Sequence, residues 1–221
     1  WLDGDRPVLI TDRARGVPLP EWLSGRSRLS FEEVVTFAEK LVGPLHALHR
    51  TGFHGNLHPG NVFVDAEGEI QLTDPCFLEG MGDIPEGELV PRDTAWLGPE
   101  QARGHWEGQV GTDIYRLALM VGYLLAGNPV MGSRSLVEQR VFVPQEVDAV
   151  FRRATHVHPD ERYRDILDFW ASFDMAWQAV QEGQLDETGI TGTITDMQAG
   201  SGWGPGSVGE TQLVPPASSL A

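Results

Sequence analysis

The sequence is 221 residues long, enough for one domain of about 150 to 200 residues with a substantial core. Its 32 acidic and 16 basic residues give a formal net charge of −16, which disfavours binding to nucleic acid or to an anionic membrane surface. A single cysteine, Cys76, excludes an internal disulfide framework and a cysteine-based zinc site, and it predicts a reducing, cytoplasmic setting. No apolar stretch approaches the roughly 18 residues of a membrane span, and no signal peptide is recognisable.

The first predicted elements are a β-hairpin and a short helix. Apolar residues 1–2 and 8–10 flank Asp3-Gly4-Asp5, a typical hairpin turn. Residues 18–23 suit the short helix. Taken alone, this pattern is compatible with any buried hairpin and carries no information on function.

Longer helices follow and make the predicted fold mainly α. Ser30 and Glu33 form a capping box at the start of the first of them. The next is almost wholly apolar, which predicts burial on all sides. The predicted helices span residues 31–50, 111–125, 147–155 and 162–180.

The most informative pattern runs from His54 to Cys76. It reads His-Gly-Asn-Leu-His-Pro-Gly-Asn over residues 54–61, followed by short apolar strands at 62–64 and 70–72 and then by Asp74. This stretch resembles the catalytic loop of protein kinases, His-Arg-Asp-Leu-x-x-x-Asn, with the strand pair and Asp-Phe-Gly that follow it. The spacing matches, and several of the residues differ.

Other segments extend the resemblance in the same order along the chain. Residues 12–14 fall at the hinge, with Thr11 at the gatekeeper place, and Glu100 ends a Gly-Pro-Glu that is similar to a kinase Ala-Pro-Glu. The resemblance implies that Asp113 holds backbone N–H groups of the catalytic loop and that Arg162 pairs with Glu100. The segment around Arg162 taken alone favours a surface charge beside a helix cap, whereas the other motifs in their order favour the pairing with Glu100.

Residues 5–178 therefore resemble the hinge and helical C-lobe of a eukaryotic-like serine/threonine kinase of the bacterial type. The implied fold is mainly α, with a short β-hairpin and hinge at the N-terminus, a small β-hairpin around the catalytic loop, and an N-lobe that is largely missing. The implied nucleotide-binding positions are Asp12, Ala14, Asn61 and Asp74. Asn61 and Asp74 also carry oxygen ligands of the kind that suits Mg²⁺.

Two catalytic positions depart from the kinase pattern. Asn56 replaces the catalytic aspartate, and an amide has no basic lone pair; the loss of a general base typically slows a reaction about 10²- to 10⁴-fold. His58 replaces the lysine that steadies the transferred phosphate, and histidine is mostly neutral at neutral pH.

Gly55 replaces the arginine that would clamp a phosphothreonine, which makes Thr94 a poor phosphoswitch. Pro75 and Cys76 predict that the segment after Asp74 is locked in one conformation.

Three functions stay open. The favoured one is a degenerate kinase, or pseudokinase, that regulates or scaffolds through protein partners; ATP and Mg²⁺ binding would then be weak or absent. The second is a weakly active ATP- and Mg²⁺-dependent Ser/Thr protein kinase, in which positioning carries catalysis. The third is a small-molecule phosphotransferase similar to aminoglycoside and choline kinases, which share the 54–61 string but lack counterparts of Glu100, Asp113 and Arg162.

The expected boundaries are 1–16 for the end of the N-lobe and the hinge, 17–180 for the C-lobe, and 181–221 for a disordered Gly/Thr/Ser/Pro-rich tail. The tail threonines are candidate phosphosites or simply solvated linker residues: Thr188, Thr191, Thr193, Thr195 and Thr211. The chain opens on Trp1 rather than Met. Whether a longer parent supplies the glycine-rich loop, the phosphate-binding lysine and its glutamate partner stays open.

Overall fold

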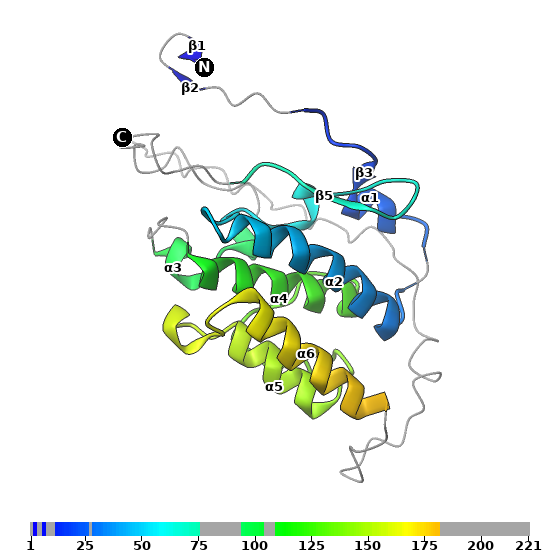
Figure 1. Ribbon diagram of the computed structural model, residues 1–221. Coiled ribbons are helices and arrows are strands. Elements are labelled where there is room, and N and C mark those ends of the chain that lie inside the picture. The colour runs from blue at the N-terminus through cyan, green and yellow to red at the C-terminus, as the bar shows by residue number, and fades with distance from the viewer. Residues whose placement is uncertain are drawn as a thin grey trace, which may run out of the picture.

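Figure 1 shows the computed structural model, which describes residues 2–3, 6–7, 12–26, 28–75, 94–103 and 109–181. The N-terminal hairpin pairs β1 (Leu2–Asp3) with β2 (Arg6–Pro7) antiparallel, Leu2 lying opposite Pro7. The second strand starts two residues earlier than predicted, because the register leaves only two residues for the turn. Predicted strand residues 8–10 and the gatekeeper Thr11 lie outside the described residues.

A three-stranded antiparallel sheet lies beside the helices. Its order is β3-β4-β5, with β3 at Val17–Pro18, β4 at Val62–Val64 and β5 at Ile70–Leu72. The pair β4 and β5 confirms the predicted strands, whereas β3 was not predicted. Gly16 permits this pairing: its φ is +80°, and a Cβ there would stand 2.0 Å from the Val64 carbonyl oxygen.

The helices agree closely with the sequence pattern. In the capping box, Ser30 Oγ accepts from the Glu33 N–H at 3.2 Å and the Ser30 N–H donates to Glu33 Oε2 at 2.7 Å. The last helix begins later than predicted because Pro159–Glu161 forms a 3-10 turn (η3) and Arg162 is extended. The helices are α1 (Leu19–Leu23), α2 (Phe31–Leu48), α3 (Pro99–Ala102), α4 (Val110–Ala126), α5 (Gln145–Ala154) and α6 (Ile166–Gln181), with further 3-10 turns η1 (Pro59–Asn61) and η2 (Thr94–Trp96).

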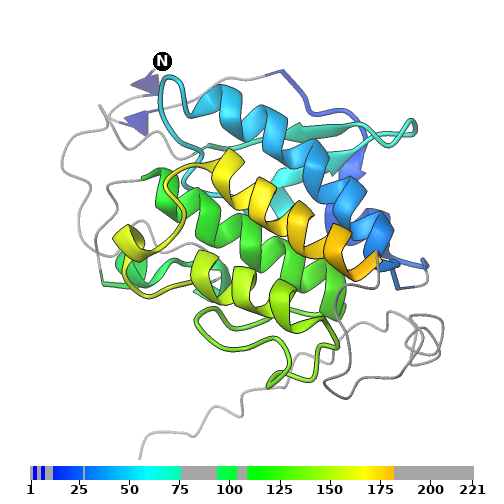
Figure 2. The ribbon, with the colours of Figure 1, turned by 60° about the horizontal axis from the view of Figure 1, so that its bottom comes forward.

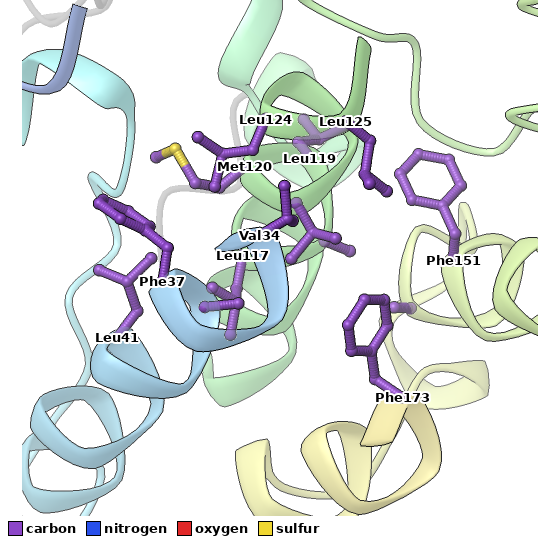
Figure 3. Packing of buried hydrophobic residues seen from close by; sticks show 14 of the residues in the cluster. Val34, Phe37, Leu41, Leu117, Leu119, Met120, Leu124, Leu125, Phe151 and Phe173 are labelled. Carbon is purple, nitrogen blue, oxygen red and sulfur yellow. The ribbon is translucent and has the colours of Figure 1, made fainter. Parts of the chain in front are cut away.

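Helix α4 is the centre of the core. It packs against α2, α5 and α6, and Figure 2 shows it running beside them. Leu117, Leu119, Met120 and Leu124 are at most 1% exposed, which confirms that this helix is buried on all sides. Figure 3 shows side chains of α2, α5 and α6 meeting those of α4, Phe173 of α6 among them. Since α4 is fixed so firmly, polar groups at its first turns have fixed positions as well.

None of the helices within the described ranges combines the length and the apolar character that a membrane span requires.

Candidate functional site

The loop that carries the predicted site residues is anchored by its backbone. Asp113, in the first turn of α4 and 0% exposed, accepts from the His54 and Gly55 N–H groups at 2.7 Å each. His49, at the end of α2, bonds through Nε2 to the same carboxylate at 2.9 Å. These bonds confirm the role that the sequence predicted for Asp113. Because they join main-chain N–H groups, the anchor does not depend on the side chain at residue 55.

The same loop is also held by its carbonyl groups, through a contact that the sequence did not predict. Gln101 Nε2 donates to the Gly55 carbonyl at 3.1 Å, and Arg116 Nη1 donates to the Leu57 carbonyl at 3.3 Å. Arg116 also donates from Nε and Nη2 to Gln101 Oε1, at 3.1 and 2.8 Å. The sequence does carry a signal for this contact, because Arg116 is a charged residue within an almost wholly apolar helix. Charged side chains are rarely buried without polar partners.

Asn56, Asn61 and Asp74, three of the predicted site residues, lie together. Asn61 Nδ2 donates to the Asn56 carbonyl at 3.0 Å, and Asn56 Nδ2 donates to the Asp74 carbonyl at 3.1 Å. The Thr73 N–H returns a bond to the Asn61 carbonyl at 3.0 Å. The loop and the end of β5 are thus joined into one hydrogen-bonded unit around residues 56, 61 and 74.

Asp74 presents its carboxylate to solvent. The residue is exposed, and within the described ranges no hydrogen bond or ion pair joins its carboxylate to another residue. Its φ is +52°, an uncommon left-handed conformation for a residue with a side chain. That Pro75 and Cys76 lock this segment stays a prediction, because Cys76 lies outside the described residues.

His58 shapes the loop locally. Its Nδ1 accepts from the Gly60 N–H at 3.1 Å, so the imidazole caps the first turn of η1. An ammonium group at this position could not accept that bond. The ring therefore has an observed role within the loop itself.

The buried His54 has an electrostatic environment of its own. Burial lowers the pKa of this imidazole below 6.5, although Asp113 acts in the opposite direction. Its Nδ1 accepts from the Asn56 N–H at 3.3 Å, while its buried Nε2 finds no hydrogen-bond partner among the described residues. We therefore expect a neutral imidazole at neutral pH.

The hinge residues stand apart from this unit. Asp12 is exposed and, with Arg13, lines a hollow of about 670 Å³ whose other lining residues include Glu69 and, in β5, Ile70 and Gln71. Ala14 is half-buried and does not line the hollow. Among the described residues, no hydrogen bond or ion pair joins either hinge residue to Asn61 or Asp74. The predicted nucleotide-binding residues therefore fall into two groups.

The predicted pair of Arg162 with Glu100 is confirmed. Arg162 Nη1 and Nη2 donate to the two carboxylate oxygens at 2.9 and 2.7 Å, and Thr112 Oγ1 donates to Glu100 Oε1 at 2.9 Å. Arg162 also donates to the carbonyls of Gly111 and His156, both at 2.8 Å. Burial by itself raises the pKa of the Glu100 carboxyl, but the bonds from Arg162 hold that pKa below its usual value.

Comparison with known proteins finds bacterial serine/threonine-protein kinases among the relatives of this chain. No family model matches the chain. The chain is 27% identical over 190 residues to the serine/threonine-protein kinase PknL of Mycobacterium tuberculosis, covering 78% of this chain and 47% of PknL. It is 25% identical over 195 residues to the serine/threonine-protein kinase PrkC of Bacillus subtilis, covering 80% of this chain and 30% of PrkC. The chain thus spans about half the length, or less, of these curated relatives.

The fold is that of a protein kinase domain. The kinase domain of PknI from Mycobacterium tuberculosis superposes with a TM-score of 0.58 at 22% identity, covering 75% of this chain and 64% of that domain. A variant of the same domain superposes with a TM-score of 0.59. The helical architecture and small sheet predicted from the sequence are therefore confirmed as kinase-like.

Proposed function

Because this chain has the fold of the helical lobe of a protein kinase, we propose that it is a degenerate kinase domain that acts through protein partners, as a regulator or scaffold. One observation carries the proposal. At the position where kinases hold a carboxylate base, Asn56 has an amide, and its Nδ2 donates to the Asp74 carbonyl. The amide oxygen that remains is not basic at neutral pH, so Asn56 cannot take the proton of a substrate hydroxyl, and losing a general base slows a reaction about 10²- to 10⁴-fold.

The side chains at the predicted metal positions, Asn61 and Asp74, nevertheless still offer oxygen ligands for a Mg²⁺-nucleotide. Asn61 uses Nδ2 within the loop, which leaves Oδ1 as an acceptor, and the Asp74 carboxylate is exposed. One carboxylate and one amide oxygen, completed by phosphates and water, suit Mg²⁺. Asn61 and Asp74 would hold the ion, and Asp12 and Ala14 would lie nearer the base. When bound, Mg²⁺ neutralises charge on the phosphates.

A weakly active Ser/Thr kinase is the second candidate, and a specific observation favours it. The loop is held on both sides, by Asp113 at its N–H groups and by Gln101 and Arg116 at its carbonyls. Positioning alone supplies a large share of the catalysis of phosphoryl transfer. A pre-positioned loop with a metal site would therefore retain slow transfer.

The small-molecule phosphotransferase has less support. The ion pair between Arg162 and Glu100 and the anchor at Asp113 correspond to features of protein kinases that the small-molecule kinases lack. The curated relatives named above are serine/threonine-protein kinases. Protein partners, and the cytoplasmic setting expected from the sequence, remain parts of the proposal.

A thermal-shift titration tests the nucleotide site. The chain is titrated with ATP, with and without Mg²⁺, beside Asp74→Ala and the control Glu39→Ala, which removes an exposed carboxylate from α2. A Mg²⁺-dependent rise in melting temperature that Asp74→Ala abolishes and Glu39→Ala keeps would support nucleotide binding at Asp74. No rise at millimolar ATP would leave a protein-binding module without a nucleotide.

Activity is tested separately, on the longest natural protein that contains this chain. We expect no transfer of labelled phosphate from ATP to protein substrates. Transfer that Asp74→Ala abolishes would refute the regulatory proposal and establish the slow kinase. Turnover of a small acceptor without protein phosphorylation would establish the third function instead.

A further inference from the structure

The amide of Asn56 closes a ring of hydrogen bonds around the site. From Asn61 the ring runs through Nδ2 to the Asn56 carbonyl at 3.0 Å, and from Asn56 through Nδ2 to the Asp74 carbonyl at 3.1 Å. It returns from the Thr73 N–H to the Asn61 carbonyl at 3.0 Å. Asn56 and Asn61 each contribute an acceptor from the main chain and a donor from the side chain, and Asn56 is the one whose side chain bonds residue 74.

The orientation of this amide is determined by its partner. The group opposite is the Asp74 carbonyl oxygen, which can only accept. The Asn56 amide must therefore turn its nitrogen towards residue 74, because its oxygen there would face another oxygen. An ionised carboxylate has acceptors only, so an aspartate at position 56 could not make this bond at neutral pH.

We propose that Asn56 is a positioning residue, which holds the main chain of Asp74 in place and thereby aims its carboxylate. The held residue is one that needs holding, since its φ of +52° is uncommon for a residue with a side chain. Pro75, which follows, has no N–H with which to stabilise the turn. The donated bond from Asn56 thus replaces stabilisation that the turn lacks.

This inference extends the proposed function and rests on it, because the proposed function is what identifies residues 56–74 as the site. It predicts that Asn56→Asp, which restores the residue type of an active kinase, loosens the site. At neutral pH the new carboxylate would remove a donor and place a charge against the Asp74 carbonyl oxygen. When protonated, its O–H would donate in place of the amide, so the damage is reversible with acid.

The test compares melting temperatures of four variants of the whole chain without nucleotide. Asn56→Ala and Asn56→Asp are measured beside Asn128→Ala and Asn128→Asp, which make the same changes at an exposed residue. We expect Asn56→Ala to lower Tm by about 2–4 °C at every pH, the value of one ordinary hydrogen bond in a chain of this size. Asn56→Asp should lower Tm roughly twice as far at neutral pH, and its deficit against Asn128→Asp should shrink towards about pH 4–5.

Hydrogen exchange supplies a local readout. The amide of Thr73, bonded to the Asn61 carbonyl, should exchange several-fold faster in Asn56→Ala than in the wild type. Melting and exchange both matching the Asn128 controls would overturn the proposal. An equal, pH-independent loss in Asn56→Ala and Asn56→Asp would overturn it too, because lost packing rather than a lost donor would explain it. Neither measurement uses ATP, so failure here leaves the nucleotide titration unaffected.

Discussion

Replacing Arg162 by methionine tests what holds the segment of Glu100 against the helical lobe. Methionine keeps much of the aliphatic length and removes every donor. In the wild type the Arg162 side chain is 0% exposed, and its guanidinium donates to both Glu100 carboxylate oxygens, at 2.9 and 2.7 Å. The variant leaves a carboxylate whose side chain is only 12% exposed and whose cation is gone.

The expected loss follows from that burial. Removing one partner of a buried ion pair costs about 3–5 kcal/mol, because the remaining charge stays out of water. A change of 1 kcal/mol shifts Tm by about 2–4 °C in a chain of this size. We therefore expect the melting temperature of Arg162→Met to fall by roughly 6–20 °C, measured by circular dichroism at neutral pH.

The pH dependence identifies the cause. The pKa of Glu100 is held below 4.5 in the folded wild type, so the stability that its pairing contributes is present above 4.5 and lost as the pH falls through the folded value. In Arg162→Met the buried, unpaired carboxyl has a raised pKa and gains a proton sooner. The gap in Tm between wild type and variant should therefore narrow as the pH falls towards 4.5.

Arg164→Met is the matched control. The Arg164 side chain is 86% exposed, and its Nη2 lies 3.6 Å from Asp168 Oδ2 in the first turn of α6. Exposed pairs of this kind contribute about 0–1 kcal/mol. If Arg162→Met melts no lower than Arg164→Met, or if its deficit does not change with pH, the buried pair does not hold this segment and the reasoning is wrong.

Two further substitutions test the anchoring of the loop, both by urea unfolding. Gly55→Ala should lower the free energy of unfolding by about 1–2 kcal/mol, because Gly55 has a φ of +65°, which side chains disfavour. The control is Gly52→Ala, where an added Cβ meets nothing within 4 Å; its free energy of unfolding should stay within about 0.5 kcal/mol of the wild-type value. Asp113→Asn should lower it by about 2–3 kcal/mol, because the new NH₂ group faces one of the N–H donors that the carboxylate accepts. An unchanged urea midpoint in Asp113→Asn would contradict the anchoring role.

The parts of the fold that could be predicted from sequence are those with a local signal. The capping box at Ser30 fixes where α2 begins, and the apolar run after Asp113 predicts a buried helix. Asp113 itself and the partnership of Arg162 with Glu100 were predicted because their order and spacing resemble kinases. In each case the signal lies within a few neighbouring residues or a motif of fixed spacing.

The remainder depends on contacts between distant residues. The strand β3 has only two residues, Val17 and Pro18, and its pairing with β4 leaves no periodic pattern to detect. The contact of Arg116 with Gln101 joins residues that only the fold brings together. Likewise, the donor role of Asn56 follows from where the Asp74 carbonyl points, which is a matter of backbone conformation.

The distribution of these contacts explains how the fold tolerates an altered site. Asp113 binds the N–H groups of residues 54 and 55, and Gln101 and Arg116 bind the carbonyls of residues 55 and 57. All of these are main-chain groups, which every amino acid except proline provides in full. Replacing the arginine and aspartate of the kinase motif by Gly55 and Asn56 therefore leaves the loop anchored. The anchors at Asp113, Gln101 and Arg116 hold main-chain atoms of the loop, so the side chains at residues 55 and 56 can differ from the kinase motif while these anchors are kept.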